Sequence, residues 1–181
     1  MKPLQPFETA RLRFRPMVEG DAAGMFALDS DPAVHRYLGG IGGRMVTHLA
    51  ESAETIAFIQ AQYRANSIGR WAVVLRATDE FVGWAGLKLV AGPVNGQRNF
   101  YDLGYRLLPR FWGQGYGYEA AHAWLNYGFG SINLERICAY ADAENAASRR
   151  ILEKIGLRQG NAFDENGTPC VWYETRNPWH L

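Results

Sequence analysis

The spacing of apolar and polar residues divides the chain into strands and helices. At Arg11–Arg15 charged and apolar residues alternate, which is typical of a strand with one solvent-facing side. Along Thr47–Asn66 apolar residues recur at intervals of three and four, which is typical of an amphipathic helix. The same criteria predict strands at 71–75, 81–90, 101–108, 136–141 and 170–174, a weak strand near Leu157, and helices at 18–29, 32–38, 116–129 and 146–155.

The order of these elements predicts the fold class. Three strands follow one another directly in the middle of the chain, and helices and strands alternate only after them. A meander followed by a crossover favours an α/β (α+β) fold with a mixed, mostly antiparallel sheet flanked by helices, rather than a doubly wound parallel sheet. At 181 residues, with no repeat or linker, we expect one domain spanning residues 1–181.

Composition argues against several function classes. A net charge of +1 gives no reason to expect nucleic-acid or membrane binding, and no apolar run reaches 18 residues. The first residues lack the apolar core of a secretory signal. Cys138 and Cys170 are far apart and stand outside any metal-binding spacing. We therefore expect reduced thiols, no metal and a cytoplasmic location.

The segment Gly113–Gly117 has the sequence Gly-Gln-Gly-Tyr-Gly and lies between a predicted strand and a predicted helix. Glycines allow a tight turn and a close approach to a ligand, and the N–H groups of the first helical turn favour an anion. This predicts a pyrophosphate cradle, although a tight turn alone would also explain the glycines. Gly115–Ala120 fits the G-x-G-x-x-A dinucleotide motif, but a meander precedes it and Asp142 comes too late for the acid of that motif.

Two longer segments resemble motifs of the GNAT N-acetyltransferases. Leu103–Ala120 resembles the acetyl-CoA motif of that family, and Asn145–Leu157 looks like the second motif of its RimJ/RimL-like branch. The opening Thr9–Pro16 is similar to the start of that branch. The resemblance covers nearly the whole chain. Trp112 departs from the general pattern, which has Arg or Gln there, and this leaves the cradle to backbone donors.

The resemblance implies acetyl transfer from acetyl-CoA to a primary amine, on a small molecule or a protein N-terminus, by direct attack in a ternary complex. The strands at 101–108 and 136–141 would splay apart, so that the pantetheine arm pairs with the strand edge near Leu107. The N–H group of Leu107 would also bind the oxyanion. The implied cofactor-binding residues are Leu107, Trp112, Gly113, Gln114, Gly115, Tyr116, Gly117, Tyr118, Asn145 and Ser148.

Three residues are the catalytic candidates. The resemblance implies that Ser148 lies near the sulfur and stabilises the CoA thiolate, although it could be an ordinary serine of a helix N-terminus. The amine must lose a proton to a carboxylate or to a water that a carboxylate orders. Asp102 is the first candidate for this base and Glu119 the second. Glu119 could instead stabilise the helix dipole, and Asn145 could be a helix cap.

The sequence leaves further alternatives. Arg149 and Arg150 could reach the CoA phosphates or lie on a solvated helix face. Acceptor specificity is expected to come from the early helices and the Gly39–Gly43 loop, and a homodimer is possible. A non-catalytic acetyl-CoA-binding regulatory module is the alternative function, because the glycine segment would serve it equally well. The tryptophans that could line an acceptor groove are Trp84, Trp112, Trp172 and Trp179.

Overall fold

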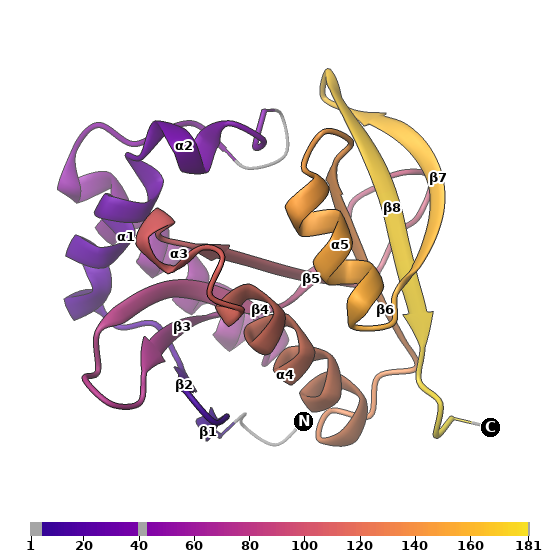
Figure 1. Ribbon diagram of the computed structural model, residues 1–181, viewed down its shortest axis with the longest axis horizontal. Helices are drawn as coiled ribbons and strands as arrows, with labels where there is room; N and C mark the ends of the chain where they lie inside the picture. The colour runs from indigo at the N-terminus through magenta and orange to yellow at the C-terminus, as the bar shows by residue number, and fades with distance from the viewer. Residues whose placement is uncertain (1–4, 40–42, 181) are drawn as a thin grey trace.

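The computed structural model describes residues 5–39 and 43–180, and its strands form one eight-stranded sheet (Figure 1). Neighbouring strands are antiparallel except β5 and β6, which are parallel. The predicted mixed, mostly antiparallel sheet is thereby confirmed. In sheet order the strands are β1 (Phe7–Glu8), β2 (Leu12–Arg15), β3 (Arg70–Leu75), β4 (Phe81–Val90), β5 (Phe100–Leu107), β6 (Arg136–Asp142), β8 (Thr168–Arg176) and β7 (Arg158–Glu165).

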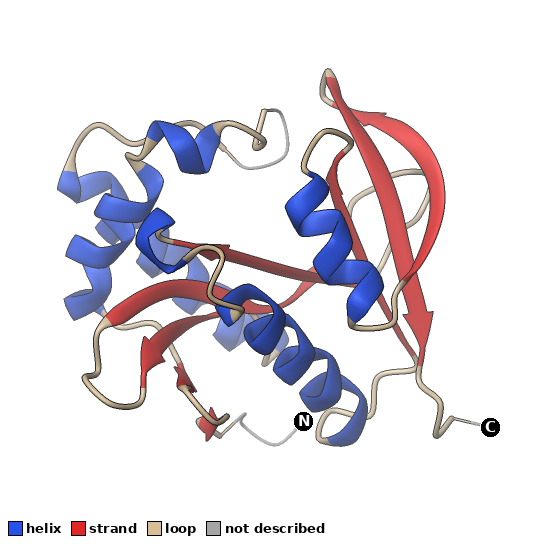
Figure 2. Ribbon diagram, in the orientation of Figure 1, coloured by secondary structure: helices blue, strands red, loops and turns tan. Residues whose placement is uncertain are grey.

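Helices flank this sheet (Figure 2). The crossover between the parallel strands β5 and β6 is α4 (Tyr116–Gly130). Within the described residues, no helix is long and apolar enough to cross a membrane. The other helices are α1 (Ala22–Asp29), α2 (Pro32–His35), α3 (Leu49–Asn66) and α5 (Ala146–Lys154), with short 3-10 turns at Glu19–Asp21 and Pro109–Phe111.

Three predicted elements differ from those observed. The helix predicted at 18–29 is a 3-10 turn followed by α1, and the helix predicted at 32–38 ends at His35. The weak strand predicted near Leu157 is a full strand, β7, which pairs with β8 and lies at the edge of the sheet. Most residues of β7 are exposed and polar, so no alternation of apolar and polar residues marks it in the sequence.

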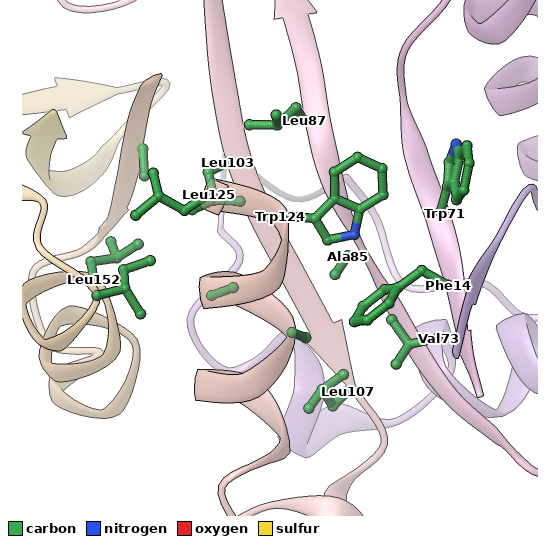
Figure 3. Packing of buried hydrophobic residues seen from close by; sticks show 14 of the residues in the cluster. Phe14, Trp71, Val73, Ala85, Leu87, Leu103, Leu107, Trp124, Leu125 and Leu152 are labelled. Atoms are coloured by element: carbon green, nitrogen blue, oxygen red, sulfur yellow. The ribbon is translucent and has the colours of Figure 1, made fainter. Parts of the chain in front are cut away.

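The core between α4 and the sheet is built around Trp124 (Figure 3). Its ring is fully buried and packs edge-on against Trp71, with ring centroids 5.4 Å apart, and against Phe7 at 5.2 Å. Burying an aromatic side chain of this size stabilises the fold by about 2–3 kcal/mol. Because Trp124 fixes α4 against β3 and the N-terminal strands, it also fixes the glycine segment that precedes the helix.

β5 and β6 diverge after a single bridge, between Asp102 and Cys138. On its other side β5 pairs with β4 along its whole length. Leu108 N donates to Val82 O, so by antiparallel alternation the odd-numbered residues of β5 direct their backbone N–H and C=O groups toward β6. The splay of the two central strands is confirmed, and it leaves the β6-facing edge of β5 open at Tyr105 and Leu107.

Candidate active site

Two adjoining cavities lie at this splay. The small cavity has a volume of about 140 Å³ and is lined mainly by β3 to β6 and the first turns of α5. The large cavity has a volume of about 450 Å³ and is lined by the glycine segment, the end of β5 and one face of α5. The two cavities share the lining residues Tyr37, Leu38, Tyr105, Arg106, Asn145 and Ser148.

The glycine segment forms one wall of the large cavity through Gly113, Gly115 and Gly117. Gly115 immediately precedes α4 and has φ +82°, a left-handed conformation that favours glycine. The amides at the start of α4 have no carbonyl group one turn earlier in the helix. They can therefore donate to an anion in the large cavity, with the helix dipole adding positive potential.

Arg11 holds the glycine segment from the outside. Its Nη1 donates to Gln114 O over 2.9 Å, and its guanidinium lies 4.2 Å from the centre of the Tyr116 ring. The Gln114 side chain donates to Arg110 O over 2.7 Å. The side chains of Gln114 and Tyr116 thus stabilise the turn, and neither residue lines either cavity.

Glu119 is bound by Arg11 as well, and by Thr9. It accepts hydrogen bonds from Thr9 Oγ1 at 2.7 Å, from the Arg11 backbone N–H at 2.9 Å and from Arg11 Nε at 2.7 Å. Burial raises the pKa of Glu119, but the hydrogen bonds from Thr9 and Arg11 outweigh burial, so its pKa is lowered. Glu119 lines neither cavity. The geometry therefore favours its structural role over the role of a base.

Leu107 and Trp112 are joined at the end of β5. Trp112 Nε1 donates to Leu107 O over 2.7 Å, and both residues line the large cavity. The Leu107 carbonyl is therefore engaged, while its N–H group points toward the open side of the strand. The Trp112 side chain thus stabilises the turn that follows β5.

The N-terminus of α5 forms the opposite wall. Asn145 is the N-cap, and its Oδ1 accepts from Ser148 N over 3.0 Å, so the capping role is confirmed. Arg150 and Lys154 line the large cavity, and Lys154 Nζ lies 4.6 Å from the centre of the Tyr118 ring. Arg149 faces elsewhere and donates to the Tyr173 hydroxyl group over 3.0 Å. Lys154 was not a candidate from the sequence, although its place one turn after Arg150 puts both cations on one helix face.

Ser148 lies where the two cavities meet. Its Oγ is 3.1 Å from the Tyr105 hydroxyl oxygen, which comes from β5 on the other side of the splay. Burial raises the pKa of Tyr105 above its usual value, while the hydrogen bond to Ser148 lowers it by less. Tyr105 therefore stays a protonated phenol at neutral pH. Its position two residues before Leu107, on the same strand face, was the sequence signal that could have identified it.

Three residues from two buried ion pairs line the small cavity: Arg70, Asp102 and Arg106. Asp102 pairs with Arg70, and Arg106 pairs with Asp29 over 2.6 Å. The ring of Trp84 lies between them, with each guanidinium 5.2 Å from its centre. Of the three catalytic candidates, Asp102 and Ser148 both line the small cavity, but the Asp102 carboxylate is paired with Arg70.

Other predicted features lie in different places. Trp84 lines the small cavity and Trp112 the large one, whereas Trp172 is buried in a second hydrophobic cluster and Trp179 is exposed. Gly40–Gly42 of the proposed specificity loop lie outside the described residues, but Tyr37 and Leu38 before them line both cavities.

Cys138 and Cys170 are free and buried, and burial raises their pKa to about 12 and about 11. The described residues contain no group of three or more His, Cys, Asp or Glu side chains that could hold a metal ion.

Comparisons with known proteins identify the family. Residues 11–158 match the family model described as an acetyltransferase (GNAT) domain. The chain is 30% identical to the uncharacterised N-acetyltransferase YoaA of Bacillus subtilis over 90% of both chains. Its fold is similar to a GNAT-family acetyltransferase from Bordetella pertussis, described as putative, with TM-score 0.79, 20% identity and coverage of 94% and 99% of the two chains.

A second similar fold is RimL, a ribosomal L7/L12 α-N-protein acetyltransferase solved in complex with coenzyme A. Its TM-score is 0.78, at 15% identity and with coverage of 95% of this chain and 98% of RimL. The match of the family model over most of the chain, together with a crossover helix entered through a glycine turn at splayed strands, leads to one conclusion. This chain belongs to the GNAT acetyltransferase family and is an acyltransferase.

Proposed function

We propose that the protein transfers the acetyl group of acetyl-CoA to a primary amine, on a small molecule or a protein N-terminus, by direct attack in a ternary complex. The observation that carries this proposal is the junction of the two cavities at Ser148. A thioester reaching the junction through the large cavity would meet an amine entering through the small one. Holding both reactants in this way removes much of the entropic cost of a bimolecular reaction.

Acetyl-CoA suits the large cavity. A volume of about 450 Å³ lies within the range of cofactor sites. The backbone from Gly113 to Tyr118 would bind the pyrophosphate, and the open edge of β5 would pair with the amides of the pantetheine arm. Arg150 and Lys154 add positive charge on the same wall for the phosphates. The complex of RimL with coenzyme A supports this assignment.

The reacting groups would be stabilised by residues at the junction. The Leu107 N–H group, which points away from β4, is proposed to bind the oxyanion of the tetrahedral intermediate. Ser148 is proposed to donate a hydrogen bond to the sulfur as it becomes a thiolate. Asn145 is proposed to contact the pantetheine arm in addition to capping α5.

For deprotonation of the amine we propose Asp102 acting through an ordered water. Asp102 lines the small cavity, but its carboxylate is paired with Arg70. The amine would therefore transfer its proton to a water held by Asp102, not directly to the carboxylate. We do not propose Glu119 as a base, because Thr9 and Arg11 occupy its oxygens outside the cavities.

We also propose that the enzyme works in the cytoplasm. Cys138 and Cys170 are both buried and free, which suits a reducing compartment.

The experiment is a screen of amines for acetyl-CoA-dependent thiol release. It would include small amines and also peptides with free N-termini, because RimL, which has a similar fold, is an α-N-protein acetyltransferase. We expect at least one amine to raise the rate, with intersecting initial-rate patterns and no acetylated enzyme by mass spectrometry. Ser148→Ala should lower kcat by about tenfold or more, whereas Ser131→Ala, at the exposed end of α4, should not. Tight binding of acetyl-CoA without turnover on any amine would favour the regulatory module instead.

A further inference from the structure

Tyr105 connects the two walls of the splay through its contact with Ser148. Its hydroxyl oxygen lies 3.1 Å from Ser148 Oγ and 3.3 Å from Ser148 O, so it sits directly over the first turn of α5. We propose that Tyr105 is a positioning residue for thioester cleavage, whose phenol O–H donates to Ser148 Oγ and so directs the Ser148 proton toward the CoA sulfur. This inference rests on the proposed function.

The Tyr105 ring is held in place by its surroundings. It lies on the same face of β5 as Leu107, against α4, where a Cβ on Gly117 would be 3.7 Å from Tyr105 Cε2. The ring is half-buried, and its open part faces the two cavities. Since burial keeps the phenol protonated, Tyr105 has a proton to donate at every pH at which the enzyme is expected to work.

The direction of the hydrogen bond between Tyr105 and Ser148 decides which of the two hydroxyl groups keeps a free O–H. Two hydroxyl groups that share one hydrogen bond leave one O–H free, and with Tyr105 as donor the free one belongs to Ser148. Ser148 lines the large cavity, so this proton can reach the sulfur. Without the phenol, the Ser148 O–H can turn toward a backbone carbonyl group three or four residues earlier in the chain. Tyr105 therefore selects the productive orientation.

The chemical step balances without a proton from Tyr105. As the tetrahedral intermediate collapses, the carbon–sulfur bond breaks and its electron pair goes to sulfur, where it receives a hydrogen bond from Ser148 O–H. The acceptor nitrogen loses its proton to water in the small cavity. The thiolate takes a proton from water after it leaves, so one proton passes in net from the amine to CoA. Both hydroxyl groups end the step protonated.

Coenzyme A itself reports on this hydrogen bond, with no acceptor needed. A donor at sulfur favours the thiolate over the thiol, so the affinity of the wild-type protein for CoA should rise by about fivefold between pH 6.5 and pH 9.5. Desulfo-CoA, which lacks the sulfur, corrects for every other pH effect and confirms that each variant is folded. After correction with desulfo-CoA, we expect the affinity of Tyr105→Phe and of Ser148→Ala for CoA to rise by less than about twofold over this pH range. The double variant should show the same small rise as either single variant.

Tyr127→Phe is the matched control, because its hydroxyl group contacts Gln5 and lines neither cavity. It should keep the full rise. If Tyr105→Phe keeps a rise that Ser148→Ala loses, or if the wild-type protein shows no rise beyond desulfo-CoA, the inference is wrong while the proposed function stands. If the wild-type protein binds neither ligand, the proposed function fails and this inference fails with it.

Discussion

Arg70 on β3 reaches the carboxylate of Asp102 on β5, although β4 lies between the two strands. The guanidinium crosses the sheet surface and donates to the carbonyl groups of Gly86 and Asp102 on the way. Gly104 makes this route possible, because a Cβ at that position would lie 2.6 Å from Arg70 Nη2. The wall of the small cavity thus depends on an ion pair between residues 32 positions apart.

Removing Arg70 should destabilise the fold. In Arg70→Met the Asp102 carboxylate, only 12% exposed, loses its partner, and we expect the free energy of unfolding to fall by about 3 kcal/mol. Urea unfolding at pH 7 measures this. Arg176→Met, which breaks the exposed pair with Glu135, is the control and should cost less than about 1 kcal/mol. Equal losses in the two variants would contradict the structural importance of the buried pair.

Asp102→Asn tests the proposed base. The amide keeps a hydrogen bond to Arg70 but cannot draw a proton through water, so we expect kcat to fall by about a hundredfold. The KM for acetyl-CoA should change little, because Asp102 lines only the small cavity. Initial rates with an amine found in the screen measure both quantities. An unchanged kcat would show that the proton leaves by another path.

Glu119→Gln is the matched carboxamide variant outside the cavities, and it should keep kcat within about threefold while losing stability. The pKa of Glu119 is lowered on folding, so its contribution is complete above the unfolded value near 4.3 and is lost as the pH falls through the folded value. We expect the free energy of unfolding of Glu119→Gln to be about 1 kcal/mol below that of the wild type at pH 7, and this difference to become smaller below about pH 4. A large fall in kcat without loss of stability would instead identify Glu119 as the base.

Gly115→Ala tests the pyrophosphate cradle. A side chain at φ +82° costs about 1 kcal/mol or more, and relief of that strain would turn the amides away from the large cavity. We expect the Kd for acetyl-CoA to rise by about tenfold in calorimetric titration. Gly130→Ala, at the end of α4, where an added Cβ would meet nothing within 4 Å beyond its chain neighbours and its own helix backbone, should bind as wild type. Equal affinities would place the cofactor elsewhere.

Local patterns in the sequence predict the parts of this site that depend on neighbouring residues. The meander, the turn into α4 and the Asn145 cap all follow from composition and spacing within a few positions. The Arg70–Asp102 pair and the Tyr105–Ser148 contact do not, because each joins residues brought together only by the order of the strands. β7 is weakly marked for another reason, since most side chains of this edge strand are exposed and show no regular alternation.

Glu119 shows how a plausible motif can mislead. From the sequence alone, a carboxylate in the first turn of a helix beside a cofactor-binding loop could be a catalytic base. It could equally stabilise the helix dipole or accept hydrogen bonds from a distant part of the chain. The hydrogen bonds from Thr9 and Arg11, which lie more than 100 positions earlier in the chain, decide between these roles.

Calorimetric titration of the purified protein with acetyl-CoA, with NAD as the control ligand, tests directly whether the large cavity binds acetyl-CoA. We expect one site per chain for acetyl-CoA, with a Kd in the micromolar range, and no binding of NAD. A protein that binds NAD, or that fails to bind acetyl-CoA, would contradict the assignment of the large cavity and the mechanism built on its junction with the small one.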